Sequence, residues 1–305
     1  MDKPIVYVIA GPTASGKTKL AVELAKRING EIVSADSMQI YKDMDIGTAK
    51  VTEEEKQNIK HYMIDIISPE ERYSVSQYKI EAENAIDEII NKGKTPIICG
   101  GTGLYINSLI YGINYQEEEI DEKYRNELNE IAQNEGLEKL YNEAIEIDPE
   151  AMQKISRNDQ KRIIRVLEIY HKTGKTKTEV EKESRSKELK YDYRVFAINM
   201  ERSILYDRIN KRVDIMIENG LIAEVQGILE KYKNFPTAMQ GLGYKEVVEY
   251  LKGSLTKEEM IEKIKMESRR YAKRQITWFK KDKDTYWLDG LDSTENNINI
   301  ILNTN

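Results

Sequence analysis

The chain has 305 residues, enough for one large domain or two modest ones, and carries a formal net charge of −6. Its single cysteine, Cys99, excludes an internal disulfide and suits a reducing compartment. No apolar stretch approaches the roughly 20 residues of a membrane span, and the first residues lack a secretory signal pattern. We therefore expect a soluble, cytoplasmic protein.

The first element with a clear chemical role is a phosphate-binding loop at residues 11–18. It matches the pattern G-x-x-x-x-G-K-[ST] at every fixed position, between an apolar strand predicted at 5–9 and a helix predicted at 19–28. Backbone N–H groups of such a loop turn onto phosphate oxygens, and the helix N-terminus adds its positive dipole end. The residues expected to hold phosphate are Gly11, Pro12, Thr13, Ala14, Ser15, Gly16, Lys17 and Thr18, with Lys17 on the terminal phosphates and Thr18 on Mg²⁺.

Two further strands are predicted to end near this loop. A strand at 31–35 stops at Asp36, and a strand at 96–99 runs into the glycine-rich segment 100–105. Ligands of open α/β sheets lie beyond the carboxyl ends of the strands, so Asp36 is expected near the phosphates as a base or a ligand of metal-bound water. A helix N-cap is the alternative role. The glycines are interpreted as backbone kept bare for a ligand, with Thr102 as a polar contact.

From about residue 113 the alternation of strands and helices stops. Residues 121–147 form an amphipathic, acidic stretch and residues 159–171 an amphipathic, basic one, both with helical spacing of apolar side chains. The charged run 179–190 is expected to be an exposed connection. We interpret 113–190 as an inserted helical subdomain.

The chain then returns to a strand pattern at 193–200, which we expect to be the last parallel strand. A helix predicted at 203–219 carries Arg208 and Arg212 one turn apart, either as phosphate ligands or as members of surface ion pairs. A long helix is predicted at 257–280. It displays basic residues near Trp278, a combination that suits RNA binding, although Trp278 itself is better explained as a core residue.

Charge is distributed unevenly along the chain. Acidic residues dominate the segment 117–150, whereas basic residues dominate 154–177 and 269–283. A single basic run is usually a solvated helix face. Two such runs in a protein with a phosphate loop leave a solvated face and a basic surface for nucleic acid as open alternatives.

Six segments together resemble one family, the tRNA dimethylallyltransferases, also called tRNA isopentenyltransferases. They are residues 11–18, 36–41, 47–50, 100–105, 240–246 and 274–278, in the family's order over nearly the whole chain. The resemblance implies an α/β fold: a P-loop NTPase-like parallel sheet flanked by helices, with an inserted all-helical subdomain and a helical C-terminal region. The implied divisions are the first part of the core at 1–112, a tRNA-binding insert at 113–190, and the remaining core with the C-terminal helices at 191–305.

The resemblance also implies a reaction. The family transfers a dimethylallyl group from dimethylallyl diphosphate to the N6 amine of the adenosine 3′ to the tRNA anticodon, and it releases pyrophosphate. Asp36 matches the residue that takes the amine proton, Thr102 contacts the adenosine, and Arg212, rather than Arg208, stabilises the leaving pyrophosphate together with Lys17 and Mg²⁺.

The implied partner is the anticodon stem-loop of tRNA, bound by a monomeric enzyme. Carried over by resemblance, the tRNA contacts are Asp36, Ser37, Met38, Gln39, Thr102, Arg125, Gln160, Lys161, Arg162, Ile163 and Ile164. The independently noted basic segment 154–177 contains the group around Lys161.

Three other functions remain open from the residues. A prenyltransferase acting on free adenine nucleotides would share the catalytic core without needing a basic surface. A small-molecule or nucleotide kinase would use the same loop to bind ATP and transfer its γ-phosphate. An RNA-binding module with bound nucleotide as a switch would not catalyse a reaction.

Overall fold

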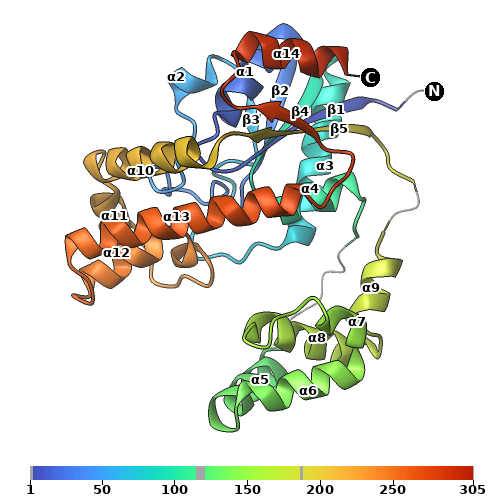
Figure 1. Ribbon diagram of the computed structural model, residues 1–305, viewed down its shortest axis with the longest axis vertical. Helices are drawn as coiled ribbons and strands as arrows, with labels where there is room; N and C mark the ends of the chain where they lie inside the picture. Colours follow the sequence, from blue (N-terminus) through green and yellow to red (C-terminus); the bar gives the residue numbers. More distant parts are fainter. Residues whose placement is uncertain (1–2, 115–120, 186–187, 305) are drawn as a thin grey trace. The chain divides into compact units, whose positions relative to one another are not determined.

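The computed structural model describes residues 3–114, 121–185 and 188–304. By its internal contacts the chain divides into two compact units, one formed by residues 1–110 and 190–305 and the other by residues 111–189. The larger unit contains a β-sheet covered by helices, and the smaller unit is built of helices (Figure 1). Each unit has a hydrophobic core of its own.

The sheet of the larger unit has six strands in the order β3-β2-β4-β1-β5-β6. All neighbouring strands run parallel, which confirms the expected α/β class. Ala10 and Ala35 are both registered partners of Gly100, so β1, β2 and β4 end at one level. The strands are β1 (Ile5–Ala10), β2 (Gly30–Ala35), β3 (His61–Tyr62), β4 (Thr95–Gly100), β5 (Asp192–Asn199) and β6 (Tyr286–Asp289).

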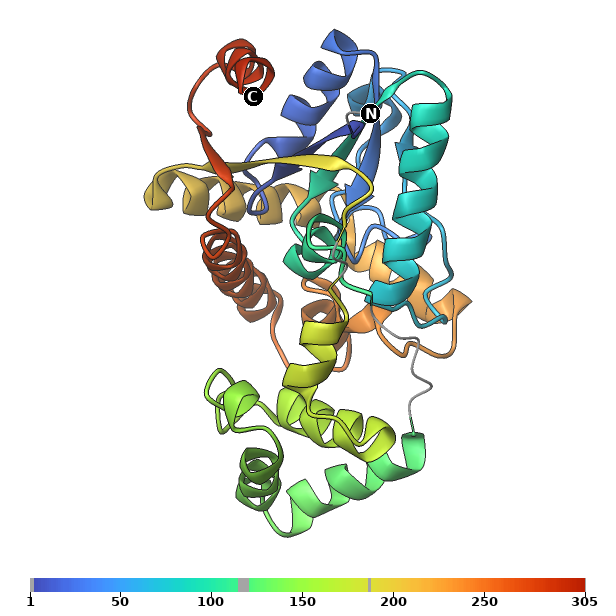
Figure 2. The ribbon, with the colours of Figure 1, turned by 90° about the vertical axis from the view of Figure 1, so that its right-hand side faces the viewer.

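Helices cover the sheet because the central strands are apolar on both faces. Tyr7 and Ile9 of β1 pack into a cluster that includes α1 (Lys17–Arg27) and α14 (Thr294–Asn303), two helices that lie against each other (Figure 2). Alternate residues point to opposite faces of a strand, and Val6 and Val8 are buried as well. The helices α3 (Val75–Asn91) and α4 (Gly103–Ile110) also pack together, with α3 against β2 and β4.

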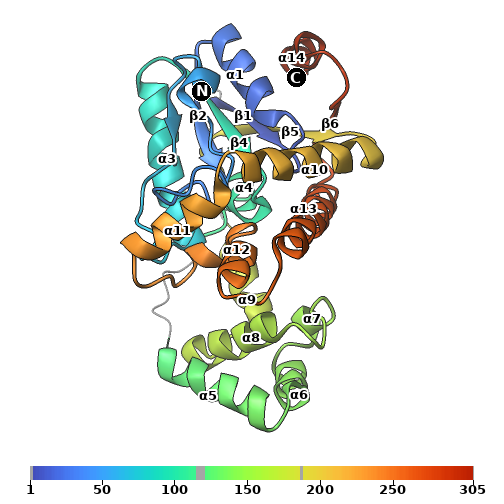
Figure 3. The same cartoon turned by 90° about the vertical axis from the view of Figure 1, so that its left-hand side faces the viewer.

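A second cluster in the larger unit is formed mainly by the helices between β5 and β6. The long helix α13 packs against α10 and α12 (Figure 3). Tyr41 and Met44, from the chain after β2, are buried in the same cluster. The helical elements outside the sheet layer are α2 (Glu53–Lys56), α10 (Arg202–Glu218), α11 (Leu221–Lys231), η1 (Ala238–Gln240), α12 (Tyr244–Leu251) and α13 (Lys257–Phe279).

The smaller unit packs its helices around a core that contains Leu140, Ile163 and Leu167. The most extensive helix contact is between α6 and α8. Its helices are α5 (Glu122–Asn134), α6 (Leu137–Ile147), α7 (Pro149–Met152), α8 (Gln160–Thr173) and α9 (Lys177–Glu183).

The acidic stretch 121–147 is helical, as expected, and consists of two helices separated at Gly136, whose φ is +96°. Two other expectations about secondary structure were wrong. The strand at 193–200 is not the last one, because β6 adds a sixth strand beyond β5 and α14 follows it. Part of the expected connection 179–190 belongs to α9, because the Thr176 side chain and Glu179 form a capping box that starts a helix there.

Within the residues that the structure describes, no helix has both the length and the apolar character to cross a bilayer.

The close approach of β4 to β2 predicts a stability difference between two glycine substitutions. A Cβ added at Gly100 would lie 2.2 Å from the carbonyl oxygen of Ala35, so we expect Gly100→Ala to lower the free energy of unfolding by about 1–3 kcal/mol. Gly227, inside α11, has open space around it. Gly227→Ala should instead raise the free energy of unfolding by about 0.5–1 kcal/mol. Urea unfolding measures both, and equal midpoints would contradict the steric argument.

Candidate active site

The loop between β1 and α1 has the backbone geometry of an anion cradle. Ala14 and Gly16 have φ of 61° and 88°, so the chain folds inward on itself before α1 begins. Gly16 is the N-cap of α1 and has no side chain to occupy the first N–H groups of the helix. The Ser15 hydroxyl is buried and has no hydrogen-bond partner among the described residues. A loop with these φ values that leads into a helix N-terminus is the arrangement that binds phosphate.

Two cations line the pocket in front of this loop. Lys17 donates from Nζ to the carbonyl oxygen of Pro12 at 3.1 Å, and Arg212 comes from α10. Burial lowers the pKa of Lys17, and the positive charge of Arg212 lowers it further, whereas Asp36 opposes the shift. Burial likewise lowers the pKa of Arg212, again opposed by Asp36. Two desolvated cations near one carboxylate give the pocket a surplus of positive charge that an anionic ligand would neutralise.

The second arginine on α10, one turn earlier, has a different position. Arg208 is exposed and is not among the pocket-lining residues, whereas Arg212 is. The position of Arg212 is compatible with a phosphate ligand and that of Arg208 with a surface residue, and the choice between phosphate ligand and surface ion pair stays a prediction for both.

The ends of β2 and β4 bring three polar side chains together. Asp36 lines the pocket, and its Oδ1 accepts from the N–H of Met38 at 2.9 Å. Thr102 Oγ1 accepts from the N–H of Ser37 at 3.0 Å and donates to Ser37 Oγ at 3.3 Å. No helix starts at Asp36, since residues 37–40 form a turn, so the alternative role as an N-cap is excluded. The carboxylate is held in a fixed orientation and remains beside the cations.

The helix α13 contributes to the site from its inward face. Gln275 is 5% exposed; its Oε1 accepts from the N–H of Thr13 at 3.0 Å and its Nε2 donates to the carbonyl oxygen of Gly101 at 2.9 Å. This one amide ties the phosphate loop to the loop that carries Thr102. Tyr271, one turn earlier, lines the pocket, and burial raises its pKa to about 12.

Sequence reasoning missed Gln275 as a site residue. On the helix at 257–280, the sequence pattern drew attention to the basic residues as candidates for RNA binding. The available signal was a polar residue inside the motif at 274–278, one helical turn after a tyrosine on the inward face.

The bare backbone at Gly100, Gly101 and Gly103 packs closely against other parts of the protein. A Cβ at Gly101 would lie 2.1 Å from Gln275 Nε2, and a Cβ at Gly103 would lie 2.3 Å from the indole ring of Trp278. Gly100 packs against Ala35 and also lines the pocket, so the expected approach of a ligand to this backbone stays a prediction. Trp278 is half-buried against this segment and is not a member of the hydrophobic clusters described above, so its expected role as a core residue stays a prediction.

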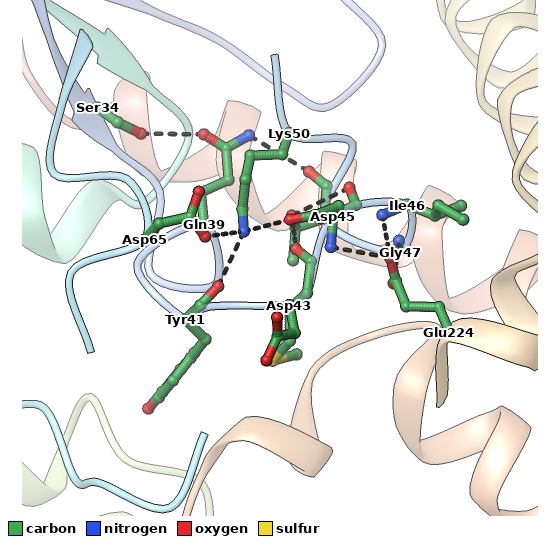
Figure 4. A network of polar contacts seen from close by, with 12 residues as sticks. Ser34, Gln39, Tyr41, Asp43, Asp45, Ile46, Gly47, Lys50, Asp65 and Glu224 are labelled. Atoms are coloured by element: carbon green, nitrogen blue, oxygen red, sulfur yellow. Dashed lines mark hydrogen bonds and ion pairs between the residues drawn. The ribbon is translucent and has the colours of Figure 1, made fainter. Parts of the chain in front are cut away.

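Another wall of the pocket is formed by the chain after Asp36. Met38 and Gln39 line it, together with Gly47, Thr48 and Ala49. Gln39 Oε1 accepts from Ser34 Oγ at 3.1 Å, and its Nε2 donates toward the carbonyl oxygens of Thr48 and Ala49 (Figure 4). The amide of Gln39 therefore has a defined orientation.

The remaining expected site residues belong to the smaller unit and differ in accessibility. Lys161 and Arg162 are exposed at the start of α8, whereas Ile163 and Ile164 are buried in the core of the unit. Arg125 and Gln160 each have a polar partner within the smaller unit. Arg125 forms a two-pronged ion pair with Glu168, and Gln160 donates to Asn129 Oδ1 at 2.9 Å.

A divalent cation would find few protein ligands here. The described residues contain no group of three or more His, Cys, Asp or Glu side chains able to hold a metal ion. Thr18 lines the pocket beside the phosphate loop. The Thr18 hydroxyl, together with diphosphate oxygens and water, would suit Mg²⁺. This ion usually binds few protein groups and keeps phosphate and water ligands.

Several known proteins similar to this chain come from one family. The sequence pattern of IPP transferase matches residues 39–282, a span that begins after the phosphate loop. The tRNA dimethylallyltransferase of Acetivibrio thermocellus is 53% identical over 293 residues, covering 95% of this chain and 94% of the relative. That of Thermoanaerobacter sp. strain X514 is 53% identical over 279 residues, covering 90% and 88%.

Solved structures agree with the sequence relatives. The tRNA isopentenylpyrophosphate transferase of Bacillus halodurans is 42% identical, with a TM-score of 0.73 over 98% of this chain and 95% of that one. A eukaryotic dimethylallyltransferase acting on tRNA is 33% identical, with a TM-score of 0.77 over 95% of this chain and 74% of the other. With its phosphate loop, its paired cations and its carboxylate at one sheet edge, this chain belongs to the tRNA dimethylallyltransferase (IPP transferase) family.

Proposed function

We propose that this protein transfers the dimethylallyl group of dimethylallyl diphosphate to the N6 amine of the tRNA adenosine 3′ to the anticodon, with release of pyrophosphate. One observation supports the proposal above the others: Lys17, Arg212 and the phosphate loop line one pocket with Asp36. A diphosphate supplies the negative charge that this pocket lacks. The carboxylate beside it supplies a base for the incoming amine.

The diphosphate half of the site acts on the leaving group. Negative charge grows on the pyrophosphate as the allylic C–O bond breaks. Lys17, Arg212 and the N–H groups of the loop then bind it more strongly than they bind the ground state, which lowers the barrier. Mg²⁺ held by Thr18 and the diphosphate would neutralise further charge on the phosphate oxygens.

The nucleobase half of the site acts on the amine. The exocyclic amine of adenine is a weak nucleophile, because its lone pair is delocalised into the ring. Asp36 takes its proton as the N–C bond forms, and the N–H of Met38 holds the carboxylate in place for this step. We assign Thr102 to contact with the adenosine, supported by its hydrogen bonds to Ser37. The target base must leave its stack to reach this site.

We assign the surface around Lys161 and Arg162 to the tRNA backbone. Both side chains are exposed at the start of α8, where they present positive charge. Ile163 and Ile164 support this surface from the core, and Arg125 supports it through Glu168. In the larger unit, Asp36, Ser37, Met38 and Gln39 face the target nucleotide.

We further propose that the protein works as a monomer in the cytoplasm. The lone cysteine, Cys99, supports the location, because thiols stay reduced in the cytoplasm.

Labelled dimethylallyl diphosphate, offered with either tRNA or AMP, tests the proposal. Label should appear on tRNA and not on AMP, and it should be lost when Mg²⁺ is chelated. Label on AMP alone would identify a free-nucleotide prenyltransferase instead. Transfer of the γ-phosphate of ATP without any prenylation would identify a kinase.

Removal of the proposed base predicts a separation of catalysis from binding. Asp36→Asn keeps an acceptor for the N–H of Met38 but cannot take a proton, so kcat should fall by about 10²–10⁴-fold. Pyrophosphate affinity, measured by calorimetry, should stay at or above the wild-type value because a negative charge near the cations is gone. Asp207→Asn, an exposed carboxylate on α10, is the matched control. Near-normal turnover of Asp36→Asn would remove this residue from the mechanism.

The surface of the smaller unit predicts a change in salt dependence. Lys161→Ala with Arg162→Ala should weaken tRNA binding and reduce the slope of log K against log salt by about 1.5, because each lost phosphate contact removes about 0.7–0.9. The control pair Lys123→Ala with Lys139→Ala removes the same charge from residues paired with Glu127 and Glu135. Filter binding at several salt concentrations measures the slopes. Equal slopes for the two double variants would exclude phosphate contacts at α8.

A further inference from the structure

One carboxylate outside the pocket holds three consecutive backbone N–H groups. Glu224, in the first turn of α11, accepts at one oxygen from the N–H of Asp45 at 3.0 Å and of Ile46 at 2.6 Å. The other oxygen accepts from the N–H of Gly47 at 3.1 Å and from the hydroxyl of Tyr244 at 2.6 Å. Figure 4 shows Glu224 directed at this stretch of chain. Hydrogen bonds to an ionised acceptor are the stronger kind.

The segment that Glu224 holds, residues 44–50, is called here the 44–50 loop. Its members Gly47, Thr48 and Ala49 line the pocket. The carbonyl oxygens of Thr48 and Ala49 accept from Gln39 Nε2 at 3.3 and 3.4 Å. The backbone of the loop therefore sets the direction of the Gln39 amide, whose oxygen is bonded to Ser34.

The loop has two other attachments, and neither replaces the carboxylate. Lys50, with a side chain 6% exposed, donates to the carbonyl oxygen of Tyr41 at 2.9 Å and pairs with Asp45 and Asp65. At the opposite side, a Cβ at Gly47 would lie 2.4 Å from the ring of Tyr244. These contacts restrict the loop, but within the described residues the N–H groups of Asp45 and Ile46 donate to Glu224. Loss of that acceptor removes the partner of the part-buried N–H groups of Ile46 and Gly47.

We propose that Glu224 is a positioning residue for tRNA. It holds the 44–50 loop in the geometry that orients Gln39 on the pocket wall, so that the target nucleotide binds productively. This inference rests on the proposed function, in which Gln39 contacts tRNA. The diphosphate end is independent of it, because Gln275 and the β1–α1 connection hold the phosphate loop.

The test compares two isosteric variants of the same helix. Glu224→Gln replaces one acceptor oxygen by an NH₂ group and cannot serve all four donors. Glu230→Gln removes the same charge at an exposed position of α11. We expect Glu224→Gln to raise KM for tRNA at least tenfold and to leave KM for dimethylallyl diphosphate within twofold of wild type, whereas Glu230→Gln changes neither value.

The split between the two KM values separates positioning from stability. A variant that merely lost folded protein would show a lower kcat with both KM values unchanged, and that result would overturn the inference. If the wild-type enzyme is active and the two variants have equal KM values for tRNA, the inference is overturned as well. That result would leave the proposed function unaffected. A wild-type protein that prenylates no tRNA would instead refute the proposed function.

Two further measurements address the route through Gln39. Since Glu224 is inferred to act through this amide, Glu224→Gln in a Gln39→Ala background should raise KM for tRNA by less than twofold. Fully additive effects of the two substitutions would overturn the inference.

If Glu224→Gln fails to fold, Tyr244→Phe removes one of the four donors and keeps the ring. It should raise KM for tRNA about two- to fivefold, and an unchanged KM would count against the inference.

Discussion

The alignment of three strand ends determines where the chemistry of this protein is located. Ala10 and Ala35 are registered with Gly100 across β1, β2 and β4, and each strand is followed by a segment with polar side chains or free N–H groups. Parallel strands point their carboxyl ends to one edge, so the three segments meet there without any long excursion of the chain. Gly100 permits this, because a side chain at that position would collide with the backbone of β2.

Electrostatics gives this edge its preference for a ligand. Burial lowers the pKa values of both Lys17 and Arg212, so the charged forms that bind phosphate are held at a cost in desolvation. The carboxylate of Asp36 offsets only part of that cost. In the proposed function, a diphosphate restores the charge balance while it is bound, and its bond to the prenyl group breaks in the same place. In the proposed reaction, the buried cations therefore serve two purposes. They favour a substrate with a charged leaving group, and they stabilise that group once the bond has broken.

Side-chain acceptors from the C-terminal helices hold the loops of the site in position. Gln275 from α13 joins the phosphate loop to the Gly101 segment, and Glu224 from α11 joins three N–H groups of the 44–50 loop. In both cases one side chain forms hydrogen bonds with several backbone groups of a loop. The helices between β5 and β6 therefore hold the loops of the pocket in position in addition to packing against the rest of the unit. The smaller unit has a separate core, which lets its surface be organised independently of the sheet.

The sequence by itself determined the features that are local in the chain. The phosphate loop, the strand before it and the helix after it depend on consecutive residues. So do the position of Asp36 at the end of β2 and the basic start of α8. Their conformations follow from glycine, from capping and from apolar periodicity within short windows. The α/β class followed from the same patterns.

Only the tertiary structure decided the contacts between distant residues. Gln275 is 262 positions from Thr13, and Glu224 is 179 positions from Asp45, so no local pattern connects them. The close packing of Gln275 and Trp278 against the glycines after β4 is likewise a contact that no local pattern shows. The strand β6 has four residues, with only one of them buried, and a segment of that length becomes a strand because β5 offers it a hydrogen-bonding edge. Local propensity specifies elements, whereas packing and hydrogen bonding between elements specify which of their side chains meet.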